Sequence, residues 1–102
     1  MEQDTIAAIS TAVSNSGIGI IRISGKDAVA VADRVYRSGG GKKRLADQPT
    51  HTIHYGYIVD QGETVDEVLV MLMRGPKSFT AEDTVEVSVD GDVLVTHRTA
   101  IM

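Results

Sequence analysis

Three stretches of this chain, residues 18–24, 53–59 and 85–89, alternate in side-chain character with a period of two, and this alternation is the feature that most constrains its fold. Successive side chains of a β-strand point to opposite faces of a sheet, so each stretch is predicted to be a strand. Residues 5–13 are small and apolar and are predicted to form a first strand or a pair of short strands. The chain is therefore expected to be built mainly around a sheet.

The faces of these strands follow from the same period. In residues 18–24, Arg22 and Ser24 would share a face with Ile18 and Ile20. Residues 85–89 would direct three valines one way and Glu86 the other. In residues 53–59 the side chains expected on one face are Ile53, Tyr55, Tyr57 and Val59.

Residues 27–37 follow the helical period instead. The apolar residues of this stretch are Ala28, Val31, Ala32 and Val35. Their i, i+3, i+4, i+7 spacing predicts an amphipathic helix. Ser24 or Gly25 is expected as its N-cap, with Asp27 in the first turn, where the helix dipole favours an acid.

Turn-forming residues mark the boundaries of the elements in the rest of the chain. Residues 60–63 separate 53–59 from a further apolar strand at 65–73, which predicts a β-hairpin that the Pro76 region ends. Residues 80–83 are predicted to form a helical turn capped by Thr80. After Gly91 a hairpin and a helix from about Asp92 both remain open. The fold class expected is α+β, a mostly antiparallel sheet with one or two helices packed on a face.

Composition narrows the classes of function. The chain has 102 residues, no cysteine and a net charge of −4. Its length fits one domain that would gain stability from a partner subunit, and the absence of cysteine excludes disulfides and thiolate chemistry. Scattered charges argue against a nucleic-acid-binding module, and the basic run at 42–44 is expected to be a solvated loop. With no signal-peptide pattern and no apolar run of about 20 residues, a cytoplasmic location without membrane contact is expected.

Common site patterns fail on this sequence. A phosphate-binding P-loop ending at Gly25-Lys26 would need a glycine where Ile20 stands. His51 and His54 are three apart in a strand region, so they would point to opposite faces and are predicted to be structural or surface residues. No metal site is expected.

Arg22 and Glu86 are the two charged residues that call for an explanation, because each lies in an apolar strand and is costly to bury without a partner. They could pair with each other across neighbouring strands, or both could face solvent. Alternatively, a ligand could supply a carboxylate to the arginine and the N–H donors of an amino-oxo heterocycle to the glutamate. A folate carries both kinds of group.

Four segments resemble the start of the tRNA-modification GTPases of the MnmE or TrmE family, namely residues 3–11, 17–25, 66–68 and 74–86. The resemblance implies an N-terminal domain similar to the folate-binding domain of aminomethyltransferases. Such a domain forms homodimers and binds a tetrahydrofolate derivative of the 5-formyl-tetrahydrofolate type. The family's folate-binding arginine falls on Arg22 and its folate-binding glutamate on Glu86. No catalytic residue is implied.

The same resemblance implies that residues 1–102 form this domain, truncated or atypical after about residue 88, with the helical and GTPase domains absent. In the family, GTP, potassium and magnesium belong to the GTPase domain. A flavoprotein partner and tRNA, modified at its wobble uridine, belong to the full-length complex. The chain alone carries no GTPase motif and is not expected to be catalytic. The alternative is a purely structural homo-oligomerisation module with no small-molecule ligand.

Overall fold

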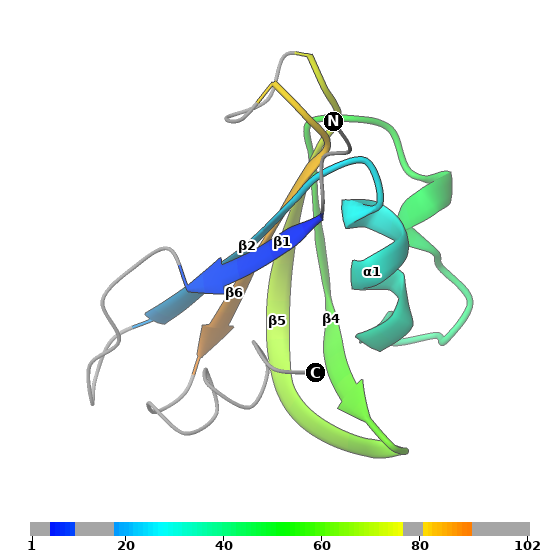
Figure 1. The fold of residues 1–102 in the computed structure, drawn as a ribbon. Coiled ribbons are helices and arrows are strands. Elements are labelled where there is room, and N and C mark those ends of the chain that lie inside the picture. The colour runs from blue at the N-terminus through cyan, green and yellow to red at the C-terminus, as the bar shows by residue number, and fades with distance from the viewer. Residues whose placement is uncertain (1–4, 10–17, 77–80, 91–102) are drawn as a thin grey trace.

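A computed structural model describes residues 5–9, 18–76 and 81–90 of the chain. Its main feature is a six-stranded sheet with strand order β1-β2-β6-β5-β4-β3, in which every neighbouring pair is antiparallel (Figure 1). The strands are β1 (Ile6–Ile9), β2 (Ile18–Ser24), β3 (Tyr36–Arg37), β4 (Thr52–Asp60), β5 (Glu63–Met73) and β6 (Thr84–Asp90). The helices are α1 (Ala28–Val35) and the short 3-10 helix η1 (Leu45–Asp47). The predicted α+β class is confirmed.

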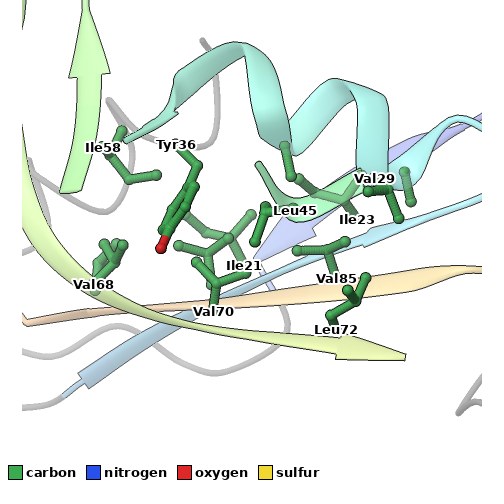
Figure 2. Packing of buried hydrophobic residues seen from close by; sticks show 14 residues of the cluster. Ile21, Ile23, Val29, Tyr36, Leu45, Ile58, Val68, Val70, Leu72 and Val85 are labelled. Carbon is green, nitrogen blue, oxygen red and sulfur yellow. The ribbon is translucent and has the colours of Figure 1, made fainter. Parts of the chain in front are cut away.

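The core lies between α1 and one face of the sheet. The strands supply Ile21 and Ile23 from β2, Val68, Val70 and Leu72 from β5, and Val85, Val87 and Val89 from β6. Ala28, Val29 and Ala32 cover them from α1, and Leu45 of η1 points into the same layer (Figure 2). Burial of each large aliphatic side chain contributes about 1.5–3 kcal/mol, so this face supplies most of the stabilisation.

The β4–β5 hairpin is confirmed, and its turn shows why the register is fixed. Asp60 pairs with Glu63, which leaves a two-residue loop in which Gln61 has φ 51° and Gly62 has φ 82°. Positive φ at both central residues is the type I′ geometry, which matches the twist of antiparallel strands. β5 ends at Met73, directly before the Arg74-Gly75-Pro76 stop.

Helix α1 is shorter than predicted at both ends. Its N-cap is Asp27 rather than Ser24 or Gly25, and the Asp27 N–H donates to Thr5 Oγ1 at 3.0 Å. At the other end Tyr36 leaves the helix because it pairs with Ile58 of β4. The Tyr36 hydroxyl also donates to the Tyr55 carbonyl at 2.8 Å. Tertiary pairing therefore overrides the helical pattern over the last residues.

Two other predictions meet different outcomes. Thr80 lies outside the described residues, but the helical turn predicted over 80–83 is wrong for the part that is described, because residues 81 and 82 form a bend and Ala81 has φ 63°. A right-handed helical turn needs negative φ. The choice between hairpin and helix after Gly91 also lies outside the described residues.

The structure decides which face of strand β4 is buried, which the alternation alone left open. Ile53 and Tyr55 share a face as the alternation predicts, but that face is exposed. The core instead takes His54, Gly56 and Ile58. Gly56 is needed there because the Tyr36 ring and the Arg37 carbonyl occupy the space in which a side chain would lie.

Candidate functional site

The sheet face opposite α1, called here the open face, is covered by no helix or strand among the described residues (Figure 1). Strand pairing places its residues in rows across the sheet. One row runs Ala8, Arg22, Glu86, Met71 and Ile53, and the next runs Ile20, Ser88, Leu69 and Tyr55. One face therefore carries both sequence-predicted site residues beside a series of apolar side chains.

Arg22 and Glu86 face each other directly, in register on β2 and β6. Arg22 Nη2 lies 2.6 Å from Glu86 Oε2, and Arg22 Nε donates to the same oxygen at 2.8 Å. Of the alternatives that the sequence left open, the structure shows the one in which Arg22 and Glu86 pair with each other across neighbouring strands. The arginine side chain remains 37% exposed and the glutamate 12%, so the pair can be reached from the open face.

The geometry of this pair leaves one acceptor open. Both contacts converge on Glu86 Oε2, and Glu86 Oε1 makes no hydrogen bond to the residues that the structure describes. A carboxylate can accept bonds at both oxygens, so Oε1 can still receive an N–H donor from a molecule on the open face. Mutual pairing and ligand binding are therefore compatible at Glu86.

A second polar contact lies at the same end of the open face. Ser24, two residues beyond Arg22 on β2, donates from Oγ to Glu82 Oε2 at 3.2 Å. Glu82 lies in the bend before β6 and has no strand pattern around it, so sequence reasoning missed it. This end of the face thus combines one guanidinium, one hydroxyl and two carboxylates.

An apolar strip continues from the charged pair across β5 to β4. Ile53 is 66% exposed, Leu69 51% and Tyr55 50%. The Tyr55 hydroxyl donates to Glu67 Oε2, and this bond raises the pKa of the phenol, so Tyr55 stays neutral and acts as a donor. Large apolar side chains gathered on one exposed face are typical of a binding surface rather than of bulk solvent contact.

The two histidines occupy different environments, and the prediction that they are structural or surface residues is confirmed. His51 is exposed, whereas His54 is buried on the helix side of β4, where Nε2 lies 2.7 Å from Thr52 Oγ1. Burial, with a smaller contribution from the nearby Lys43 charge, lowers the pKa of His54. His54 therefore belongs to the fold and not to the open face.

This lowered pKa predicts a pH dependence of stability. Below about pH 6.5 the unfolded chain binds a proton that folded His54 resists, so the free energy of unfolding should fall as pH decreases from there toward the folded pKa. One such proton can contribute at most about 1.4 kcal/mol per pH unit. Urea unfolding between pH 7.5 and 5.5 measures the effect.

The matched variant for this measurement is His54→Gln, which should flatten the slope. An equal slope in wild type and His54→Gln would assign the pH dependence to other groups.

Other kinds of site find no support in the part of the chain that the structure describes. It contains no group of three or more His, Cys, Asp or Glu residues placed to hold a metal ion. Nor does any helix within those residues have the length and apolar character needed to cross a membrane.

Comparison with known proteins places this chain in a family. A family model described as "GTP-binding protein TrmE N-terminus" matches residues 5–101, and the chain belongs to this family. Among its relatives, proteins named tRNA modification GTPase MnmE from Exiguobacterium sibiricum and Enterococcus faecalis are 54% and 53% identical over 100 residues. The protein of the same name from Lachnoclostridium phytofermentans is 50% identical over 98 residues.

These matches cover nearly the whole chain but only a part of each relative. The three alignments span 96% of this chain and 21% of each relative. The chain therefore corresponds to about a fifth of the length of the MnmE proteins it matches, and it is similar to their N-terminal part. The resemblance drawn from the four sequence segments is confirmed.

Proposed function

We propose that this chain is the tetrahydrofolate-binding and dimerisation domain of a tRNA-modification GTPase. The observation that carries the proposal is the Arg22–Glu86 pair on the open face, with Glu86 Oε1 available as an acceptor. The pterin of a folate presents adjacent N–H donors on its amino-pyrimidinone edge, which match a carboxylate. The Arg22 guanidinium, in contact with Glu86, would donate to an acceptor on the same end of the folate.

The surroundings of the pair fit the remainder of such a ligand. A folate joins its two polar ends through flat aromatic rings, which need an apolar surface to lie against. Met71 and Ile53 extend from Glu86 in the same row of the sheet, and Leu69 lies in the adjacent row. When bound, the folate would supply a one-carbon unit. The chain's own residues would hold and orient it.

A second copy of the chain is the proposed cover for the apolar strip. An open face with Ile53, Tyr55 and Leu69 half or more exposed is unfavourable in water, and a homodimer would remove that surface from solvent. A folate lying between two copies would also be shielded from water on both sides. The full-length activity, with tRNA, GTP and a flavoprotein partner, belongs to this proposal through the family and not through any residue of the open face.

Isothermal titration of the purified chain with 5-formyl-tetrahydrofolate tests the folate proposal. Wild type is expected to bind, and Arg22→Ala and Glu86→Gln should each weaken binding at least about tenfold, since each removes a charge-assisted contact. Arg34→Ala on α1 and Glu63→Gln at the β4–β5 turn make the same chemical changes elsewhere and should bind like wild type.

The outcomes separate ligand binding from simple pairing. If Arg22 and Glu86 only pair with each other, both variants will shift the unfolding midpoint but leave the folate affinity unchanged, which contradicts the proposal. If well-folded wild type gives no binding heat yet forms a dimer, the alternative applies, and the chain is a structural homo-oligomerisation module. The exposed apolar strip is the observation that favours this second candidate.

A further inference from the structure

The positive charge of the chain is concentrated in one short segment. Residues 34–44 contain five of the ten lysines and arginines and no aspartate or glutamate. The net charge of −4 thus divides into +5 for these eleven residues and −9 for the rest. Three of these cations form a run at residues 42–44. Arg34 lies in the last turn of α1 and Arg37 in β3, and the loop that follows β3 carries the run (Figure 1).

Three of these cations line one hollow on the surface. Arg37, Lys43 and Arg44 surround it together with Asp33, Tyr36 and Gly41, and this set is called here the basic hollow. All three cationic residues are exposed. The hollow lies by the C-terminal end of α1, on the opposite side of the sheet from the open face, so it is separate from the proposed folate site.

The loop that carries the basic hollow is held in place. The Asp33 carboxylate accepts the Leu45 N–H at 2.7 Å and the Ala46 N–H at 2.9 Å. The Ser38 hydroxyl accepts the Lys43 N–H at 3.2 Å, and Leu45 is anchored in the core. The cations therefore project from a fixed backbone, so less conformational entropy is lost when they bind a partner.

The cations of the basic hollow have no acidic partner within the described residues. Arg37 uses Nη1 to bind the carbonyls of Asp33, Arg34 and Tyr36, but no carboxylate contacts its guanidinium. The side chains of Lys43 and Arg44 make no hydrogen bond or ion pair there. Asp33, the one acid that lines the hollow, already binds two backbone N–H groups.

The backbone beside the basic hollow is also accessible. A Cβ added at Gly39 or Gly40 would meet nothing within 4 Å, and neither residue has a positive φ. Neither packing nor backbone conformation therefore requires glycine at these two positions. The loop therefore carries no side-chain bulk at these two positions, which leaves room for a bound partner beside the cations of residues 42–44.

We infer that the basic hollow binds the phosphate backbone of tRNA. The choice of tRNA as the nucleic acid rests on the proposed function. The choice of phosphate rests on the three cations of the basic hollow, which are exposed and have no acidic partner among the described residues. The hollow offers no exposed aromatic side chain for base stacking, since Tyr36 is buried. It therefore contacts the backbone without reading the base sequence, and it positions the RNA on the side of the domain away from the folate.

Fluorescence anisotropy with an unmodified tRNA transcript tests this inference at several salt concentrations. The double variant Lys43→Gln/Arg44→Gln is expected to bind about tenfold more weakly at low salt, with a salt slope reduced by about 1.5, because each phosphate contact contributes about 0.7–0.9 to the slope. Lys26→Glu makes the same change in net charge near the start of α1, and it should bind within about twofold of wild type.

Each result supports or overturns the inference. Equal weakening by Lys26→Glu would mean that net charge alone acts, and unchanged binding in the double variant would place the RNA elsewhere. Absence of wild-type binding would also overturn it. Competition by polyglutamate as effective as competition by tRNA would replace RNA with an acidic protein partner. Circular dichroism checks that the variants fold.

Folate titration of the same variants distinguishes this inference from the proposed function. The double variant should bind 5-formyl-tetrahydrofolate like wild type, and Arg22→Ala should bind tRNA like wild type. If the wild type binds folate but not tRNA, the role of the basic hollow is rejected and the proposed folate site stands. If the wild type binds tRNA but not folate, the folate site is rejected and the basic hollow remains an RNA contact.

Discussion

Replacing Gly56 by alanine is expected to destabilise the protein by about 3 kcal/mol, a large part of the stability of a small domain. An added Cβ would lie 2.5 Å from Tyr36 Cε1 and 2.6 Å from the Arg37 carbonyl oxygen, so the ring and the β3 backbone would both have to move. That movement would also break the hydrogen bond from the Tyr36 hydroxyl to the Tyr55 carbonyl. Urea unfolding followed by circular dichroism measures the loss.

The matched control for this prediction is Gly39→Ala, where an added Cβ meets nothing. It should leave stability unchanged or raise it by up to about 1 kcal/mol, because alanine reduces the freedom of the unfolded chain. Equal unfolding midpoints for Gly56→Ala and wild type would show that the Tyr36 ring does not pack against β4 as described.

Leu69→Asp is expected to abolish the proposed homodimer, with a dissociation constant raised at least about a hundredfold. Leu69 is 51% exposed at the centre of the apolar strip, and a dimer that buries it would have to bury a carboxylate without a partner. Because the side chain faces solvent in the single chain, the variant should still fold. Sedimentation equilibrium over a range of concentrations measures the association.

Ala30→Asp provides the control for Leu69→Asp, since it adds the same charge at an exposed position on α1, across the sheet from the strip. It should associate like wild type. Equal loss of the dimer in both variants would indicate a charge effect, and an unchanged dimer in Leu69→Asp would place the interface on another surface.

The sequence predicted the elements better than it predicted their relations. The period of two assigned Arg22 and Glu86 to strands and to faces, because alternation is a local property. Their contact depends on β2 lying beside β6, and the two residues are 64 positions apart in the chain. No local pattern encodes such a pairing, so the direct contact remained one of several alternatives until the strand order was known.

Strand β4 shows a second limit of local patterns. The alternation of residues 53–59 groups Ile53 with Tyr55 but does not decide which face is buried, and the core takes the face of His54 and Gly56. The reason is the shape of Tyr36, whose ring needs the space above a residue without a side chain. The end of α1 was misplaced for a related reason, since the residues that finish the helical pattern pair with β4 instead.

The basic hollow was predicted only in part. Residues 42–44 stand out in the sequence as a basic run, but Arg37 belongs to a different element and joins them only through the return of the loop beside α1. A negative net charge for the whole chain therefore does not exclude a local concentration of positive charge on its surface.

The strand order also has a consequence for how the chain folds. β1 with β2 and β4 with β5 form pairs of neighbours in sequence, whereas β6, the last strand described, lies between β2 and β5. The two early pairs can form while the chain is still being synthesised, but they stay separate, with the valine and isoleucine faces incompletely covered, until residues 84–90 are available. The pairing of β6 with both β2 and β5 thus makes folding cooperative, and a ribosome that stalls before residue 84 would hold two unjoined hairpins prone to aggregation.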